Sequence, residues 1–469
     1  MNILLIFPKI MYYARTDFHP IGLLSLAGYL EKYIPDIKMK FLDFNTYPLN
    51  DDEFLKLVAD FEPDIIGASV STLHYPHAAH ISKLVRKHFP KIKVVWGGPH
   101  IELEMEECSE SCDFALRGEA EHTFYELITS IGKSETDFSL IKGISYKKDG
   151  KIIHNPQRER FKNIEDLPWP AYHLIDLKKY FEYPLVGIIT NRGCPFICTF
   201  CGTPARWGQM VVSRSVKNIV DEIQYLHDVH GAKGVYFFDD IFNIPRQRAI
   251  DICNEIIKRG LHKKMYFQAQ LRANKGMVSE EMFRKLKIAN FNKVSFGIES
   301  ASQRVMDAMK KNLTIEEVEE ALKMSIAAGL DTRGYFMIGN WDEGLIDIWK
   351  TVRFIIKMKL PPSICIAVPL PGTEFYNILK ANGKLDPKKI DWGKATASIS
   401  LVDTNKLKKW QINLVYKFIY NFFYLKKAYN LPMERKIDFF KKKIRSIKSK
   451  IKNFFASDAI TEKPTAIRA

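Results

Sequence analysis

Short apolar runs alternate with amphipathic helical segments along the first 135 residues of the chain. Each apolar run has the length of a buried strand, and each intervening segment carries apolar residues at helical spacing. The expected strands span residues 2–7, 38–43, 64–70, 93–96 and 114–117, and the expected helices span residues 21–33, 52–60, 78–88 and 121–131. This alternation predicts a parallel, doubly wound α/β sheet.

Small and polar residues follow the ends of these expected strands. Because ligands of a doubly wound sheet bind beyond the carboxyl ends of its strands, these residues are candidate ligand contacts. They are Asp43, Ser69, Ser71, Gly97, Gly98, His100, Arg117, Gly118 and Glu119. The pattern alone indicates a Rossmann-like nucleotide-binding domain.

A second α/β series begins at Leu185, after a connector with a turn at residues 147–150. Its expected strands span residues 185–190, 234–238, 265–270, 293–298, 333–338 and 363–368. Six strand–helix units predict a partial (β/α)6 barrel, whose chemistry lies at the carboxyl ends of its strands. From about residue 392 the alternation stops and a helical, basic segment follows. We therefore expect a domain at 1–135, a linker at 136–180, the barrel at 181–391 and a C-terminal segment at 392–469.

The positive charge of the chain is concentrated in its C-terminal segment. The 469 residues carry a formal net charge of +16, and residues 401–469 hold 17 Lys and Arg against 5 Asp and Glu. This excess leaves about +4 for the rest of the chain. The basic residues alternate with aromatic ones at 439–455, most densely at 441–443 and 448–452. Three explanations stay open: a solvated helix packed on the barrel, a helix lying on an anionic membrane, and, least favoured, nucleic-acid binding.

Cysteine usage and apolar run lengths indicate the compartment. Seven cysteines form no paired framework, and the first apolar run is too short for a targeting segment. We therefore expect a cytoplasmic protein, with peripheral contact at the inner membrane face as an open alternative. No uninterrupted apolar run reaches the length of about 18 residues that a membrane-spanning helix needs.

Three cysteines directly after the first barrel strand carry the most specific chemistry. Cys194, Cys198 and Cys201 have the spacing C-x3-C-x2-C. Three thiolates this close can bind three irons of a [4Fe–4S] cube and leave the fourth iron open for a small molecule. A zinc site would need a fourth ligand at close spacing, and the nearest histidines, His173 and His227, lie far away in sequence. The remaining cysteines, at 108, 112, 253 and 365, are expected to be structural thiols rather than ligands of a second cluster.

With Phe200 before its last cysteine, this motif resembles that of the radical S-adenosylmethionine enzymes, and residues 1–390 resemble the cobalamin-binding class of that family. The resemblance implies that the amino and carboxylate groups of S-adenosylmethionine chelate the open iron. An electron, supplied by a reductant such as flavodoxin or ferredoxin, then releases a 5′-deoxyadenosyl radical that abstracts hydrogen from an unactivated carbon. The cofactors supply this chemistry, and the protein supplies binding and positioning.

The resemblance also implies which barrel residues contact S-adenosylmethionine. They follow or end later barrel strands: Asp239, Arg272, Glu299, Gly334 and Gly339. Glu299 belongs to a sequence, residues 295–299, similar to the family's S-x-G-x-E element. Two structural alternatives stay open: Asp239 and Asp240 can cap the next helix, and Arg272 can form a surface ion pair.

In the N-terminal domain the same resemblance implies cobalamin contacts. They are Ser69, Ser71, Gly97, Gly98, Gly118 and Glu119. The D-x-H-x-x-G signature of proteins that donate a histidine to cobalt is absent, which puts an axial histidine in doubt. His74 and His77 lie where a lower cobalt ligand would be expected, although such histidines more often cap helices or lie on the surface.

The expected activity is methylation of an unactivated carbon in a small-molecule or lipid-like substrate, with methylcobalamin as the donor. A radical rearrangement, cyclisation or C–C coupling without methyl transfer is the alternative within the enzymes. A cobalamin or cluster sensor without catalysis is the alternative outside them. The sequence carries no readable code for the substrate, because substrate-contacting loops differ without a fixed pattern.

Overall fold

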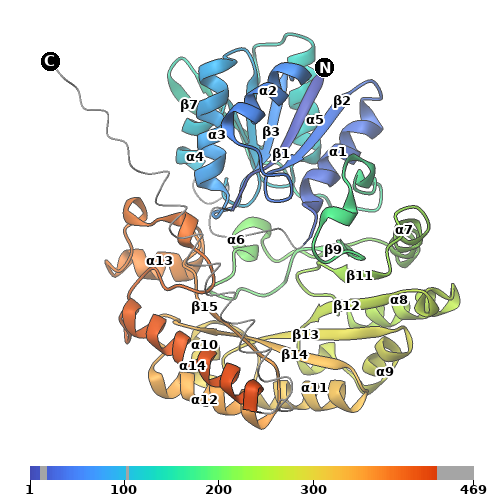
Figure 1. Ribbon diagram of the computed structural model, residues 1–469, viewed down its shortest axis with the longest axis vertical. Helices are drawn as coiled ribbons and strands as arrows, with labels where there is room; N and C mark the ends of the chain where they lie inside the picture. Colours follow the sequence, from blue (N-terminus) through green and yellow to red (C-terminus); the bar gives the residue numbers. More distant parts are fainter. Residues whose placement is uncertain (11–17, 102–104, 430–469) are drawn as a thin grey trace. The chain divides into compact units, whose positions relative to one another are not determined.

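Two large β-sheets, one short two-stranded sheet and the surrounding helices make up the described part of the unit from Met1 to Asn413 (Figure 1). The computed structural model describes residues 1–10, 18–101 and 105–429. A second unit begins at Leu414, inside the last helix, α14 (Lys409–Tyr429). The protein is an α/β protein, as the sequence predicts.

The N-terminal sheet has seven strands in the order β2-β1-β3-β4-β5-β6-β7. The first five are parallel: β1 (Asn2–Phe7), β2 (Lys38–Asp43), β3 (Ile65–Ser69), β4 (Lys93–Gly97) and β5 (Phe114–Leu116). The hairpin β6 (Ile144–Lys148) and β7 (Lys151–His154) continues the sheet antiparallel to β5. Five helices accompany the sheet: α1 (Ile21–Tyr33), α2 (Asp51–Phe61), α3 (Tyr75–His88), α4 (Met105–Ser111) and α5 (Ala120–Gly132).

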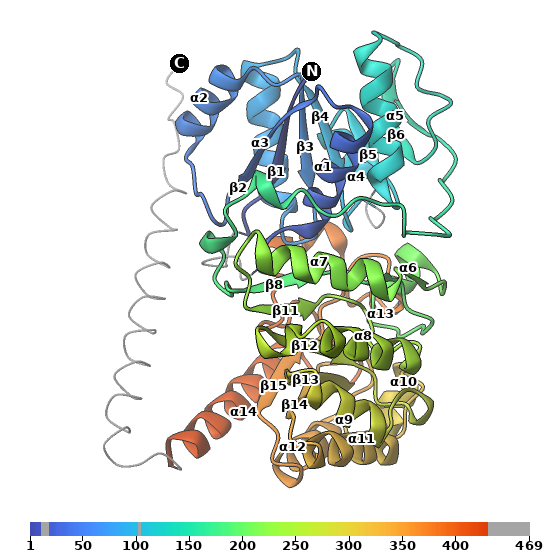
Figure 2. The same ribbon diagram turned by 90° about the vertical axis from the view of Figure 1, so that its right-hand side faces the viewer.

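Alternate strand residues bury themselves under helices on opposite faces of this sheet. Ile3 and Leu5 of β1 pack with residues of α1 and α5, whereas Leu4 and Ile6 pack with residues of α2, α3 and α4. This period of two residues is what a sheet covered on both faces requires. Figure 2 shows α2 and α3 on one side of the strands and α1 and α5 on the other. The domain is therefore Rossmann-like, which confirms the predicted class.

The second sheet is entirely parallel and has the order β15-β14-β13-β12-β11-β8. Its strands are β8 (Leu185–Ile188), β11 (Gly234–Phe237), β12 (Tyr266–Leu271), β13 (Phe291–Glu299), β14 (Asp331–Ile338) and β15 (Pro362–Ile366). Because the order is linear, with β8 at one edge and β15 at the other, the six strands form the predicted open series. A short antiparallel pair, β9 (Asn191–Arg192) and β10 (Val212–Ser213), follows β8.

Helices cover the outer face of the second sheet, and α7, α8, α9 and α11 lie side by side in chain order (Figure 2). The helices of this region are α6 (Thr203–Trp207), α7 (Val216–Asp228), α8 (Arg246–Lys258), α9 (Glu280–Ile288), α10 (Gln303–Ala308), α11 (Ile315–Ala327), α12 (Leu345–Lys357) and α13 (Glu374–Ala381). This arrangement leaves the carboxyl ends of the strands free to carry a site.

The C-terminal basic cluster predicted at residues 439–455, with lysines at 441–443 and 448–452, lies outside the described residues. Of the C-terminal segment expected at 392–469, the structure describes the residues up to 429, which include α14, a helix of 21 residues. Within residues 1–10, 18–101 and 105–429, no helix is both long and apolar enough to cross a membrane.

Candidate functional site

The cysteine triplet lies in a loop between β9 and α6, beyond the carboxyl end of β8. Cys198 is buried, while Cys194 and Cys201 are half-buried. The loop is fixed by backbone hydrogen bonds to distant segments: Thr199 N donates to the Met309 carbonyl at 2.9 Å, and Phe375 N donates to the Thr199 carbonyl at 2.9 Å. The middle of the triplet is therefore held from two other parts of the barrel.

The chemistry of these side chains fits an iron–sulfur cube. In the described part of the chain, no three His, Cys, Asp or Glu side chains converge as the ligands of one metal ion. A cube has a different requirement, because three of its irons each take one thiolate and the three sulfurs do not converge on a single ion. Burial raises the pKa of Cys194 to about 11 and also raises the pKa of Cys201. Cluster assembly must therefore release protons from these thiols, as metal binding to cysteine generally does.

Arg272, directly after β12, lies against this loop rather than on the surface. Its Nη1 points to Cys198 Sγ at 3.9 Å, and its guanidinium stacks on the Phe196 ring at 3.3 Å. Nε donates to Asn274 Oδ1 at 2.6 Å, and Nη2 donates to the Lys311 carbonyl. A fixed cation beside a thiolate stabilises negative charge there and is placed to bind a carboxylate.

Glu299 ends β13 in a conformation that side chains rarely adopt, with φ of 72°. Non-glycine residues in this region store strain that functional sites often use. Its Oε1 accepts from Lys311 Nζ at 3.1 Å, and only 7% of the Lys311 side chain is exposed. Lys311 therefore connects Glu299 with Arg272, because its carbonyl accepts from Arg272. No sequence pattern indicated Lys311, which lies between α10 and α11.

The two aspartates after β11 have different surroundings. Asp239 is buried, and its Oδ1 accepts from the backbone N–H groups of Thr190 at 2.6 Å and Asn191 at 3.0 Å. Burial raises the pKa of Asp239, and these bonds oppose the rise. Asp239 therefore anchors the segment that leads to Cys194, and its predicted contact with S-adenosylmethionine stays a prediction. Asp240 instead accepts from Thr203 Oγ1 at 3.2 Å, at the start of α6, and lines a cavity.

The two predicted glycines of β14 lie at a strand interior and a strand end. A Cβ on Gly334 would approach Ile298 Cδ1 at 2.7 Å, so this glycine allows close packing with β13. Gly339 has φ of +85°, and its N–H donates to Glu343 Oε2 at 2.7 Å. Burial raises the pKa of Glu343 to about 7, although the Asn340 and Gly339 N–H groups lower it. Both glycines remain predicted contacts of S-adenosylmethionine.

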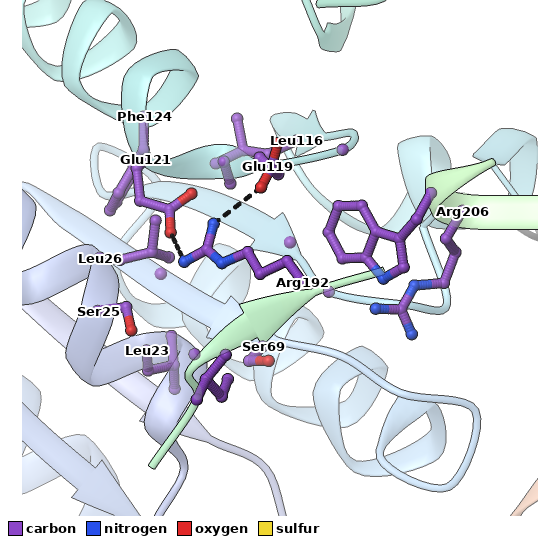
Figure 3. Close-up of a pocket in the computed structure, with 18 of the residues that line it drawn as sticks. Leu23, Ser25, Leu26, Ser69, Leu116, Glu119, Glu121, Phe124, Arg192 and Arg206 are labelled. Atoms are coloured by element: carbon purple, nitrogen blue, oxygen red, sulfur yellow. Dashed lines mark hydrogen bonds and ion pairs between the residues drawn. The ribbon is translucent and has the colours of Figure 1, made fainter. Parts of the chain in front are cut away.

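A cavity of about 330 Å³ lies at the carboxyl edge of the N-terminal sheet (Figure 3). Five of the six predicted cobalamin contacts line it: Ser69, Gly97, Gly98, Gly118 and Glu119. The sixth, Ser71, is not among the lining residues, and its Oγ bonds His74 Nδ1 at 2.8 Å. The barrel side of the cavity is formed by Ile189, Asn191, Arg192, Gly193, Arg206, Trp207, Phe238 and Asp240. The two halves of the chain therefore share one cavity.

Part of the edge of this cavity is formed by glycines, which let a large ligand approach the backbone closely. Gly98 has φ of +103°, and a Cβ there would lie 2.9 Å from both the N and the O of Val70. Gly118, with φ of 74°, lies on the neighbouring strand end. These residues fit a corrinoid, whose large planar ring needs backbone without side chains in its way.

The histidines considered for cobalt have other partners. His77 Nδ1 accepts from Lys9 N at 3.0 Å, and His74 precedes α3 with its ring against Phe7. Burial is the main cause that lowers the pKa of His74 and of His77 to about 4 each, so both rings are neutral. Neither residue lines the cavity. Their role as cobalt ligands gains no support from this placement.

Arg192 is a cavity residue for which the sequence indicated no role, and Glu121, two residues after the predicted contact Glu119, lines the cavity with it. Arg192 Nη1 donates to Glu119 Oε1 at 3.0 Å, and Nη2 donates to Glu121 Oε1 at 2.6 Å (Figure 3). Glu119 Oε2 also accepts from the Phe161 backbone N–H at 2.8 Å. This carboxylate therefore joins the N-terminal sheet, the connector and the barrel.

Two of the remaining cysteines lie in the core of the N-terminal domain. Cys108 belongs to α4 and Cys112 follows it, and Cys112 Sγ donates to the Cys108 carbonyl at 3.2 Å. Burial raises the pKa of Cys112 to about 12, which keeps its thiol neutral.

Two family models match separate parts of this chain. The B12 binding domain matches residues 9–128, and the radical SAM superfamily matches residues 188–355. The matches cover, respectively, the sheet edge with the glycines and the barrel with the cysteine triplet.

Known proteins are similar over most of the chain. The Uncharacterized methyltransferase PH0819 of Pyrococcus horikoshii is 32% identical, over 91% of this chain and 93% of the relative. Cytidylyl-2-hydroxyethylphosphonate methyltransferase of Streptomyces wedmorensis is 26% identical over 79% of each chain. The solved structure of the cobalamin-dependent S-adenosylmethionine radical enzyme OxsB has a TM-score of 0.75 at 20% identity, covering 96% of this chain and 71% of that one. At that identity the structural likeness shows the fold.

Proposed function

This chain belongs to the cobalamin-dependent radical S-adenosylmethionine enzymes, and we propose that it methylates an unactivated carbon of a small-molecule or lipid-like substrate. The cofactors of the family are a [4Fe–4S] cluster, S-adenosylmethionine and cobalamin. When bound, the cluster with S-adenosylmethionine supplies a hydrogen-abstracting radical, and cobalamin supplies the methyl group.

The observation that carries the proposal is the shared cavity. Gly97, Gly98 and Gly118 line it from the N-terminal sheet, and Gly193, the residue before Cys194, lines it from the barrel. A carbon radical formed near the cluster has a short lifetime in the presence of other reactants, so a methyl donor must be bound nearby. The name of the relative that is 32% identical supports the same activity.

The barrel residues have separate roles in this proposal. Cys194, Cys198 and Cys201 hold the cluster. Arg272 pairs with the carboxylate of S-adenosylmethionine, because its guanidinium already lies beside Cys198. Glu299, with Lys311 fixing its orientation, accepts from the ribose or amino group. Asp239 keeps the strand end before Cys194 in place, and its neighbour Asp240 is the carboxylate that faces the cavity.

Labelled S-adenosylmethionine tests the proposed methylation directly. The reconstituted holoenzyme, with reductant and a candidate substrate, is expected to place the labelled methyl group in the product. Each methylated product should be accompanied by one S-adenosylhomocysteine and one 5′-deoxyadenosine, because one S-adenosylmethionine supplies the methyl group and another the radical. Mass spectrometry quantifies the methylated product, S-adenosylhomocysteine and 5′-deoxyadenosine and thereby gives their ratio. Product without label, formed together with 5′-deoxyadenosine, would instead establish a rearrangement, cyclisation or C–C coupling.

We further propose that a small one-electron carrier such as flavodoxin or ferredoxin reduces the cluster.

We also propose that α14 contributes to peripheral membrane contact. Four large apolar side chains recur along one side of α14 and are more than half exposed: Trp410, Leu414, Phe418 and Leu425. Exposed lysines lie in the same helix at 409, 417 and 426. An apolar stripe with lysines beside it suits a surface of anionic lipid.

Vesicle sedimentation tests this contact. The full chain is expected to sediment with vesicles that contain phosphatidylserine and to stay in solution with pure phosphatidylcholine. The double variant Trp410→Ser/Phe418→Ser should bind at least about tenfold more weakly, because two aromatic side chains no longer enter the interface and even their partial burial is worth more than about 1.4 kcal/mol. Ile346→Ser is the control, since Ile346 is 76% exposed on α12 instead. Equal binding by the double variant and the wild type would refute a role for α14.

A further inference from the structure

A half-buried arginine joins the two cofactor regions of the chain. Arg192 extends from β9 into the shared cavity, and its two terminal nitrogens bind two different carboxylates (Figure 3). Glu119 directly precedes α5, and Glu121 lies in the first turn of that helix. The guanidinium fork suits this task, because its donors point in fixed directions.

Arg192 and its two carboxylate partners form a bridge that is largely shielded from solvent, and the carboxylates stabilise the charge of the guanidinium. The Arg192 side chain is 18% exposed, whereas the side chains of Glu119 and Glu121 are 2% and 7% exposed. Burial opposes the charge of Arg192, but Glu121 and Glu119 outweigh this effect and raise the pKa of the guanidinium. Arg192 is therefore charged, and its removal leaves two carboxylates without their main partner in a buried place.

The backbone around Arg192 is held by the connector and by the residue after β11, and it leads directly into the cluster loop. The Arg192 carbonyl accepts from Arg160 Nη2 at 3.3 Å, and the preceding Asn191 N–H donates to Asp239. Only Gly193 separates Arg192 from Cys194. If the Arg192 guanidinium moves in the cavity, we therefore expect Cys194, the first cluster ligand, to move as well, because Gly193 alone lies between the two residues.

We propose that Arg192 is a positioning residue that couples cobalamin binding to S-adenosylmethionine binding at the cluster. The inference rests on the cofactors of the proposed function. A corrinoid at the cavity excludes water from the two ion pairs and strengthens them, because charges attract more strongly where the dielectric constant is low. The strengthened bridge holds β9 and the cluster loop in the arrangement that binds S-adenosylmethionine. Coupling of this kind is reciprocal, so each ligand tightens the other.

The experiment measures cobalamin affinity with and without S-adenosylmethionine. Full-length protein with a reconstituted cluster is titrated with hydroxocobalamin in the absence of reductant, and binding is followed by visible absorption. In the wild type, S-adenosylmethionine is expected to tighten cobalamin binding about fivefold or more, which is the usual range for coupled sites. In Arg192→Met the ratio of the two affinities should fall to about one.

Two further variants test whether the coupling needs the bridge between both carboxylates or only a positive charge at position 192. Arg192→Lys keeps the positive charge but lacks the fork that reaches both carboxylates, and it should lose most of the coupling. Glu121→Gln removes one carboxylate and should lower the ratio in the same direction. As a second readout, also without reductant, cobalamin should tighten S-adenosylmethionine binding by the same factor in the wild type but not in Arg192→Met, because coupling between two sites is reciprocal.

Arg304→Met is the matched control, because Arg304 also bridges two carboxylates, those of Asp342 and Asp347, within the barrel. Its coupling ratio should equal that of the wild type. A wild-type ratio of one, or a ratio that survives in Arg192→Met, overturns the proposal, as does an equal loss in Arg304→Met. If Arg192→Met does not fold, Arg192→Lys and Glu121→Gln decide. Failure of the wild type to bind either cofactor would instead contradict the proposed function.

Discussion

Cys198→Ala is expected to abolish 5′-deoxyadenosine formation while leaving cobalamin binding largely intact. Cys198 is the most buried of the three thiols, and the Arg272 guanidinium points at its sulfur. Without it one iron of the cube loses its protein ligand, so the cluster that activates S-adenosylmethionine cannot be held. Iron content, the cluster absorption and the yield of 5′-deoxyadenosine after reduction measure the loss.

The cobalamin affinity of Cys198→Ala shows whether the substitution affects the cluster alone or both cofactor sites. We expect it to change by no more than about tenfold, because the coupling through Arg192 is modest compared with loss of a ligand. Cys253→Ala is the control: Cys253 is a fully buried thiol in α8, and its removal should leave both cofactors bound. If Cys198→Ala lost cobalamin and cluster together, the division of the site into two modules would be wrong.

The sequence predicted most of the fold because its strands and helices have clear periods. The strands at residues 2–7 and 38–43 and the helix at 21–33 have the predicted bounds. The sequence did not indicate α4, whose seven residues are too few to establish a helical period. The turn at residues 147–150 predicted a hairpin, but not that Tyr146 pairs with Phe114. That pairing extends the sheet and depends on contacts that no local pattern encodes.

Site residues that belong to a sequence motif could be predicted. Site residues that come together only through the tertiary structure could not. Asp239 and Asp240 are adjacent, so their side chains leave the backbone in different directions, and the structure alone tells which one faces the cavity. Arg192 and Glu119 are 73 residues apart in the chain. Their ion pair depends on how the barrel meets the N-terminal sheet, which the sequence pattern did not reveal.

Gly98 is where the backbone itself forms the edge of the cavity. Its φ of +103° disfavours any residue with a Cβ, and that Cβ would lie 2.9 Å from both Val70 N and Val70 O. Val70 cannot yield easily, because its N–H donates to the Gly97 carbonyl at 2.7 Å and its carbonyl accepts from His100 N at 3.0 Å. An alanine at this position must therefore shift residues 97–100 away from Val70, which strains both of these hydrogen bonds and moves the backbone that lines the cavity.

Gly98→Ala is accordingly expected to weaken cobalamin binding by about 100-fold, since strain at such a position costs about 1–3 kcal/mol and each 1.4 kcal/mol is about tenfold in affinity. The cluster and reductive cleavage of S-adenosylmethionine should persist, which is the reverse of the result expected for Cys198→Ala. Gly150→Ala is the matched control, because Gly150 has φ of +76° in the β6–β7 turn and a Cβ there has no atom within 4 Å. It carries similar backbone strain without crowding, so its cobalamin titration should match that of the wild type. Equal affinity in Gly98→Ala and Gly150→Ala would show that the 97–100 backbone does not border the cobalamin site.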